Sequence, residues 1–366
     1  MVLDFFPSAT LTKYLAKTFI LRILAVLVML VLVLLMLDLL SNSADILAYQ
    51  GNGQGELLTY ASLRIPQLIA RFLPYSILLA TIITLATMNQ NSEVIAMKAS
   101  GLSAHQILAP LLLTAMVIAG FSFLFNERVV TRATATLSAW EKAEYGPVPD
   151  DPDTRTTVYL ADGNDVLLAS TVRGRGADTV MEDVTFYQRD DNGMMLRQWR
   201  GSRATYANPG WMLEDPEVFN VGPAEERALD EPTLIAPELG LDQLELRTVN
   251  PDAESLPQLS RSIEALEAAG RQTSELRGRW WHKISGPLSA VLMPLLGAVA
   301  GFGLARSGHL FARAVIGMAL GFAYFVVDNA ALAMGSFGGY PPLLAAWAPF
   351  LLFFLIGETV LVRTEE

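Results

Sequence analysis

The chain has 366 residues, of which 52% are hydrophobic and 17% are charged. The apolar residues gather in long blocks, which excludes an ordinary soluble protein, while the charged fraction excludes a chain made only of membrane helices. Of the 37 acidic residues, 28 lie between Glu127 and Arg279, together with 16 of the 26 basic ones. The acidity therefore belongs to a central polar segment. It argues against nucleic acid as a partner, because phosphate binding needs a basic surface.

The first half of the chain predicts three membrane-spanning helices. A short interfacial helix, up to about Lys17, leads into a first span at Phe19–Leu40, and further spans follow at Ile65–Met88 and Ala104–Phe125. Each is long enough to cross about 30 Å of hydrocarbon as a helix. A cleaved signal peptide is the alternative for the first span, although its apolar run exceeds an ordinary signal core and more spans follow. The second half predicts three more spans, at Ile284–Leu304, Ala314–Met334 and Leu343–Val362.

A polar link, Asn91–Ser103, joins the second and third spans and predicts a helix of about two turns. The Ser92 hydroxyl is placed to cap the first turn. Glu93 in that turn and Lys98 in the last turn both suit the helix dipole. Gly101 supplies a residue that can stop a helix in a left-handed turn. Such a helix is too short to cross a bilayer. It is either a helical turn between two spans or a rigid surface helix that docks on a soluble partner.

Lysines and arginines near the span ends predict the orientation in the membrane. The two short loops on one side, Ser41–Ser62 and Gly335–Pro342, contain neither residue. The N-terminus, the Asn91–Ser103 link and the C-terminus should therefore be cytoplasmic. The central polar segment should lie outside, most simply in a bacterial periplasm. The basic residues on the cytoplasmic side are Lys13, Lys17, Arg22, Lys98, Arg306, Arg313 and Arg363.

The central segment changes to the sequence pattern of short β-strands. Runs rich in β-branched and aromatic residues are separated by turn signals such as Asp162-Gly163 and Asn208-Pro209-Gly210. Several short strands with tight turns predict an all-β, antiparallel sandwich or jelly roll. The expected strands are 156–161, 165–171, 183–188, 202–207, 211–213, 217–221 and 244–249.

One amphipathic helix is expected between the β-domain and the fourth span. Over Gln258–Ala269, Leu259, Ile263 and Leu266 share one face, and Gly270 ends the helix. The chain then divides into four parts. These are spans one to three with the polar link at 1–126, a periplasmic β-domain at 127–255, a connecting helix at 256–283 and spans four to six at 284–366.

The sequence carries none of the common catalytic motifs. It has no Walker A motif, so it does not hydrolyse ATP by that route, and it has neither His-Glu-x-x-His nor Gly-x-Ser-x-Gly. Its three histidines, His105, His282 and His309, lie far apart in sequence, which argues against a shared metal site. Without cysteine it has no disulfide and no thiol chemistry. We therefore expect neither a metal nor a catalytic residue in this chain.

Asp328 lies inside the fifth span, in Phe325-Val326-Val327-Asp328-Asn329. A carboxylate at a helix centre costs about 2.5–3.5 kcal/mol on insertion scales, so it should face protein or water. Two interpretations stay open: a polar contact in a transport path or at a subunit seam, and an interhelical hydrogen bond. An intramembrane enzyme is a further alternative, with Asp328 as its acid.

Several basic residues are exceptions to this distribution of Lys and Arg, because they lie at the predicted outer ends of spans three and four. Those before the fourth span are interleaved with Trp280 and Trp281, which an ordinary aromatic belt explains. The alternative is a basic collar that meets an anionic lipid headgroup, because guanidinium groups bind phosphate as bidentate forks. The collar residues are Arg128, Arg132, Arg277, Arg279 and Lys283.

Five motifs form a recognisable pattern when they are combined with the order of spans and strands. They are Ser92–Gly101 (SEVIAMKASG), Asn250-Pro251-Asp252-Ala253, Trp281-x-Lys283-Ile284 with Pro287-Leu288-Ser289, Phe325-x-x-Asp328, and Gly339-x-Pro341-Pro342. The pattern resembles the LptF/LptG family, the paired permease subunits of the lipopolysaccharide exporter. The resemblance covers nearly the whole chain. Its most specific part is Ser92–Gly101, which is similar to the family's cytoplasmic coupling helix.

The resemblance implies a subunit of an ATP-driven transporter, with no cofactor in this chain itself. A separate LptB-type ATPase, which binds ATP and Mg²⁺, would grip the coupling helix. An LptF-type permease would complete a cavity that takes lipopolysaccharide from the outer leaflet of the inner membrane, and LptC- and LptA-type proteins would carry the lipid onward. The implied ATPase contacts are Ser92, Glu93, Ala96, Met97, Lys98 and Gly101.

One departure from the family concerns headgroup binding. Family members can carry lysines at the outer end of the first span, whereas Leu37–Asn42 offers none, so Arg71 or the collar around Arg279 would have to substitute. Two other classes fit parts of the sequence. A permease of the lipoprotein or macrolide exporter type generally has fewer spans. A membrane-anchored periplasmic binding or sensor protein would need a cytoplasmic output domain, for which the cytoplasmic segments are too short.

Overall fold

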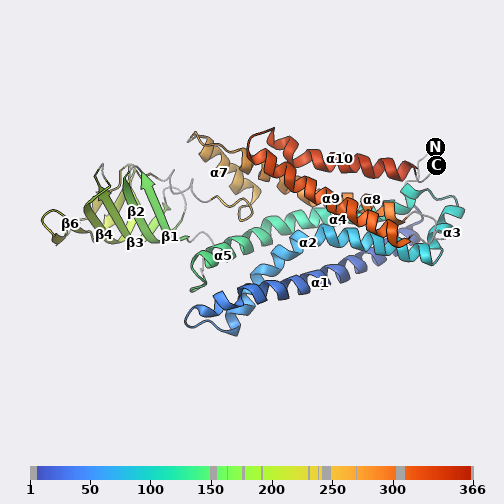
Figure 1. Cartoon of the computed structure of the whole chain (residues 1–366), viewed down its shortest axis with the longest axis horizontal. Coiled ribbons are helices and arrows are strands. Elements are labelled where there is room, and N and C mark those ends of the chain that lie inside the picture. The colour runs from blue at the N-terminus through green and yellow to red at the C-terminus, as the bar shows by residue number, and fades with distance from the viewer. Residues whose placement is uncertain are drawn as a thin grey trace.

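The computed structural model describes residues 6–148, 155–162, 164–174, 178–190, 193–229, 231–237, 239–240, 249–268, 270–301 and 310–363. It contains a bundle of long helices and a separate antiparallel β-sheet (Figure 1). The sheet lies beyond one end of the bundle, and the short helix α3 (Glu93–Ala99) lies at the opposite end (Figure 1). The predicted combination of membrane helices with an inserted all-β domain is confirmed.

Helix α1 (Ala9–Ala48) is one continuous helix of 40 residues. Ser8 caps it, because its hydroxyl accepts a hydrogen bond from the Leu11 N–H at 3.4 Å. The prediction of a separate interfacial helix up to Lys17 is wrong. No Gly or Pro interrupts this stretch, so its polar first turns and the apolar span continue as one element. Helix α2 (Gln54–Gln90) likewise begins before the predicted second span.

The third predicted span coincides with helix α4 (Ala104–Phe125). A capping box begins it: the Ser103 hydroxyl accepts from the Gln106 N–H, and the Gln106 side chain accepts from the Ser103 N–H. The helix then continues through a π-helical turn, η1 (Asn126–Val130), into α5 (Thr131–Lys142). Helical structure therefore extends past the boundary expected at residue 127.

The second half of the bundle consists of α7 (Leu256–Ala268), α8 (Ser274–Gly301), α9 (Leu310–Ser336) and α10 (Pro342–Arg363). Among the described residues, five helical stretches are long and apolar enough to cross a membrane, namely α1, α2, α4 to α5, α9 and α10. Helix α8, where the fourth span is expected, begins with polar turns and packs inside the bundle against α2, α4, α9 and α10. The end of that expected span, 302–304, lies outside the described residues.

The core of the bundle lies where α8 meets α2 and α4. Leu292, Leu295 and Leu296 of α8 are almost completely buried. Gly297 allows the close approach, because a Cβ atom there would lie 2.8 Å from Cγ2 of Thr81 on α2. A side chain at position 297 would therefore push the two helices apart.

The β-domain is a single antiparallel sheet among the described residues. Strands β1 to β5 are neighbours in chain order, and β8 pairs with β5. The long strand β4 pairs with β3 on one edge and with both β5 and β6 on the other, and β7 pairs with β6. The strands are β1 (Arg155–Asp162), β2 (Asp165–Arg173), β3 (Val180–Arg189), β4 (Met195–Tyr206), β5 (Trp211–Glu214), β6 (Glu217–Asn220), β7 (Glu225–Ala228) and β8 (Thr233–Ile235).

Apolar side chains from one face of the sheet form the core of this domain. Leu167 and Ala169 alternate into it, and Trp211 is fully buried, with its indole N–H donating to the Leu239 carbonyl at 2.7 Å. Sequence patterns missed β7, whose side chains are all exposed, and β8, which has three residues. The strand expected at 244–249 lies almost wholly outside the described residues.

Candidate functional site

Helix α3, the polar link between α2 and α4, has an inner and an outer face. Val94 and Met97 lie three residues apart, so they share one side of the helix, and both are buried in the core of the bundle. The exposed residues of the helix are Ile95, Ala96, Lys98 and Ala99. Ile95 is half exposed, at 50%, and was not among the contacts that the resemblance implies. The helix is therefore fixed to the bundle on one side and open to a partner on the other.

The two ends of α3 are built differently. Ser92 precedes the helix with a left-handed φ of 62°, and its hydroxyl makes no capping bond, so the predicted side-chain cap is wrong. At the other end Gly101 has a φ of 90°, as the sequence predicts. The Gly101 N–H donates to the Lys98 carbonyl at 3.0 Å, and the Leu102 N–H donates to the Met97 carbonyl at 3.2 Å. These two bonds form the Schellman motif, which satisfies the last carbonyls of the helix.

Contacts around α3 bring the first and last helices to the same end of the bundle. Tyr14, near the start of α1, donates a hydrogen bond to the half-buried carboxylate of Glu93 at 3.3 Å. Nε2 of His105, at the start of α4, lies 3.4 Å from Oε2 of Glu358, near the end of α10. The start of α1 and the end of α10 are therefore both on the side of the bundle that is far from the sheet (Figure 1).

Asp328 of α9 faces the interior of the bundle and is 6% exposed. Its Oδ2 lies 2.9 Å from Nε2 of His282 on α8, so the interhelical hydrogen bond is present. Its Oδ1 is buried and has no hydrogen-bond partner among the described residues. The sequence did not identify His282 as this partner. A histidine at the start of one predicted span and a carboxylic acid inside the next are the sequence features that could have indicated this contact.

The collar residues do not form one basic surface. Arg277 is exposed but binds Glu267 of α7 through two hydrogen bonds, at 2.7 and 2.8 Å. These bonds raise the pKa of Arg277, and together with a bond from Thr273 they lower the pKa of Glu267. Arg279 is partly buried. The fully outward-facing candidates are Arg71 on α2, Arg128 on η1 and Arg132 on α5.

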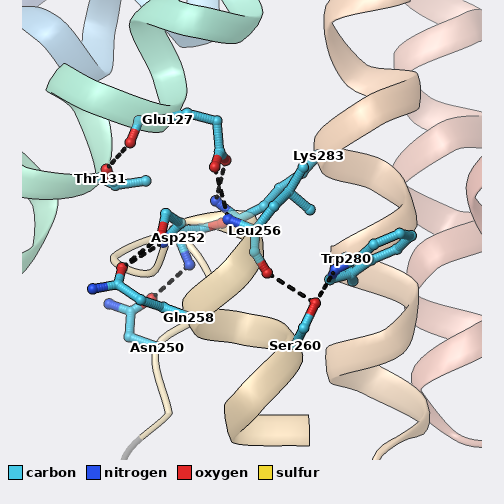
Figure 2. Close-up of polar contacts among 10 residues, drawn as sticks. Glu127, Thr131, Asn250, Asp252, Leu256, Gln258, Ser260, Trp280 and Lys283 are labelled. Atoms are coloured by element: carbon cyan, nitrogen blue, oxygen red, sulfur yellow. Dashed lines mark hydrogen bonds and ion pairs between the residues drawn. The ribbon is translucent and has the colours of Figure 1, made fainter.

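Lys283, the remaining collar residue, points into the structure (Figure 2). Its side chain is 9% exposed, and its Nζ lies 3.6 Å from Oε1 of Glu127 on η1. Burial lowers the pKa of Lys283, and the nearby carboxylates, above all that of Glu127, oppose this shift. A buried cation that already has an anionic partner is less available to a lipid headgroup than an exposed arginine.

A model of the family described as "Lipopolysaccharide export system permease LptF/LptG" matches residues 13–363. This chain belongs to the LptF/LptG family. It is 26% identical to the lipopolysaccharide export system permease protein LptG of Escherichia coli (strain K12), over 98% of this chain and 99% of that protein. It is 24% identical to the LptG protein of Haemophilus influenzae, over 85% of this chain and 87% of that protein.

Membership of the LptF/LptG family decides between the functional classes that the sequence left open. The match includes the helices at both ends of the chain and the β-domain between them. It supports an export permease over a lipoprotein- or macrolide-type exporter and over a periplasmic sensor. The family is one of transport subunits, and both relatives named above are LptG proteins.

Near Leu37–Asn42, where the resemblance led us to look for lysines, a polar cluster lies between α1 and α2. Asp38 binds Arg64 of α2 through two hydrogen bonds, at 2.8 and 3.1 Å. The Tyr60 hydroxyl donates to the same carboxylate at 2.8 Å. This cluster joins α1 to α2. It pairs the charge of Arg64 within the chain.

Proposed function

We propose that this chain is the LptG-type permease subunit of an ATP-driven exporter in the inner membrane of a bacterium. The exporter would extract lipopolysaccharide from that membrane and pass it to a periplasmic bridge toward the outer membrane. The observation that carries the proposal is the placement of α3 and the β-domain at opposite ends of one helical bundle (Figure 1). A chain built in this way can receive a push at one end and release a lipid at the other.

The ATPase would dock at the α3 end. The distribution of Lys and Arg favours a cytoplasmic location for α3 and both termini, and a periplasmic location for the β-domain. An LptB-type ATPase, which holds ATP and Mg²⁺, would contact the exposed side of α3, and Met97 would act from the inside by anchoring the helix to the core. The proposed direct contacts are Ser92, Glu93, Ile95, Ala96, Lys98 and Gly101.

The lipid headgroup would meet the outward-facing arginines. Phosphate groups pair with guanidinium forks, and Arg71, Arg128 and Arg132 are exposed, with Arg279 partly so. An LptF-type permease would supply the other wall of the lipid cavity. LptC- and LptA-type proteins would receive the lipid after the β-domain.

Purification of the chain with its native partners tests this proposal. We expect an ATPase, a second permease of the same family and bound lipopolysaccharide to be recovered with it. Glu93→Ala should reduce recovery of the ATPase without affecting membrane insertion. Glu225→Ala, on exposed strand β7 of the β-domain, is the matched control and should have no effect. Recovery of a lone monomer, or an equal ATPase yield from Glu93→Ala and the parent, would contradict the proposal.

A further inference from the structure

Glu127, in the π-helical turn between α4 and α5, contacts the helices that follow the β-domain in the chain (Figure 2). Its carboxylate Oε2 accepts the Leu256 N–H, at the start of α7, at 2.7 Å. Its Oε1 lies 3.6 Å from Nζ of Lys283 on α8. Its backbone carbonyl accepts the Thr131 hydroxyl of α5 at 2.8 Å. Because η1 runs directly into α5, which precedes the β-domain, Glu127 joins this continuous helix to both helices that follow the domain.

The start of α7 is shaped to receive this carboxylate. The Asn250 side chain accepts the Asp252 N–H at 3.1 Å, which turns the chain as it returns from the β-domain (Figure 2). The Gln258 side chain accepts the Ser255 N–H at 3.0 Å. The Leu256 N–H belongs to the first turn, where a helix provides no acceptor of its own. Glu127 supplies that acceptor from another element.

The π-helical turn explains why Glu127 points inward. A π-turn inserts an extra residue into a helix and changes which side chains face the core, and such turns are frequent at functional sites. Within η1, Glu127 is 14% exposed at its side chain, whereas Arg128 and Val129 beside it are exposed. The local geometry thus directs one anion toward α7 and α8 and leaves a cation at the surface.

Stability alone is a weak reason for this arrangement. The desolvation of two buried charges offsets most of their attraction, and apolar residues of similar size often stabilise a fold as well or better. A second ion pair, between Glu267 and Arg277, already links the other end of α7 to α8, and the Trp280 indole donates to the Ser260 hydroxyl at 2.9 Å. What Glu127 adds is a link from α7 to η1, that is, from the helix after the β-domain to the helix before it.

We propose that Glu127 is a positioning residue, which clamps the start of α7 to η1 and α8 and thereby holds the β-domain in line to receive lipid from the bundle. The proposal rests on the proposed export function. It gives Lys283 a role as the counter-charge of the clamp. Loosening the clamp should leave extraction of the lipid intact and impair only its transfer to the β-domain.

The test follows lipid in the complete transporter, reconstituted in liposomes with purified lipopolysaccharide. A photo-crosslinking amino acid is placed at Phe72 in the bundle or at Trp199 in the β-domain, and ATP-dependent adducts are measured at each position. Glu127→Ala should lower the Trp199 adduct by about tenfold, the factor that one charge-assisted hydrogen bond makes in an equilibrium. The Phe72 adduct and the ATPase rate should stay within about twofold of the parent. An unchanged Trp199 adduct would overturn the proposal.

A double variant separates positioning from stability. Glu127→Leu with Lys283→Met removes the clamp without leaving a buried charge, so the protein should fold and insert normally. If Glu127 positions α7, the Trp199 adduct stays low in this variant. If Glu127 serves only stability, the adduct returns to the parent level, which would also overturn the proposal. Glu267→Gln, which breaks the exposed pair between α7 and α8, is the matched control and should transfer normally.

Failure of the underlying function has a different signature. Absence of ATP-dependent adducts at both Phe72 and Trp199 in the unmodified chain would contradict lipid export itself. A different result would be a parent that gives adducts at both positions while Glu127→Ala lowers both equally or lowers neither. That result would contradict only the clamp.

Discussion

Replacement of His282 by alanine should destabilise the bundle, because it leaves the buried carboxylate of Asp328 without its hydrogen-bond partner. That carboxylate is 6% exposed, and His282 Nε2, at 2.9 Å, is its hydrogen-bond partner. A hydrogen bond to a charged group contributes about 1.5–3 kcal/mol, and removal of one partner of a buried pair costs about 3–5 kcal/mol. His282 is partly exposed, at 30% of its side chain, so water can reach the gap. A loss of about 2–3 kcal/mol, within the lower of these two ranges, is therefore expected.

The assay is thermal unfolding of the purified chain in detergent, followed by tryptophan fluorescence. A loss of about 2–3 kcal/mol lowers the unfolding midpoint by roughly 3–4 °C for a chain of 366 residues, because the shift is the free-energy loss divided by the entropy of unfolding. His282→Gln keeps an N–H donor and should recover part of the loss. The double variant His282→Phe with Asp328→Leu removes both polar groups and should unfold near the parent midpoint. Equal midpoints for His282→Ala and the parent would refute the reasoning.

Three further changes probe other parts of the molecule. Glu93→Ala should lower recovery of the ATPase by about tenfold, as measured by quantitative mass spectrometry, since one charged contact is lost; full recovery would argue against docking at α3. Gly297→Ala should destabilise by about 1–3 kcal/mol, because the new methyl group meets Thr81. Gly120→Ala, where an added Cβ meets nothing within 4 Å, should not destabilise, and equal losses would count against close packing of α8 on α2. Because hydrogen bonds from Arg277 and Thr273 lower the pKa of Glu267, the stabilisation from this carboxylate is present above the ordinary carboxyl pKa and disappears as the pH falls through the lowered value. The difference in unfolding midpoint between Glu267→Gln and the parent should therefore vanish on acidification, and a difference that persists would contradict this origin.

Hydropathy predicted the membrane part of the fold well, because the apolar blocks are long and a bilayer imposes their length. Helix α4 was predicted residue for residue, and α9 and α10 within a few residues. The error at α1 came from treating its polar first turns as a separate element. A helix continues until something stops it, and no such residue occurs before Ala48.

The contacts of the candidate sites were less accessible to sequence reasoning. Gly101 was identified correctly, because a left-handed C-terminus is a local property. The role of Ser92 was not, because its backbone conformation depends on how α2 ends. The acceptor of the Leu256 N–H lies 129 residues away in sequence, on Glu127, and no local pattern in one sequence connects the two. For the same reason Lys283 was grouped with the surface arginines.

The most direct test of the export function is ATP-driven transfer of lipopolysaccharide in a reconstituted system. Liposomes would contain this chain, its partner permease, the ATPase and lipopolysaccharide, and a soluble LptA-type acceptor outside would carry a photo-crosslinker. We expect adducts on the acceptor that require ATP and fall by about tenfold when Glu93 is changed to alanine. Transfer that does not depend on ATP, or no transfer with all components present, would contradict the assignment of this chain as an export permease.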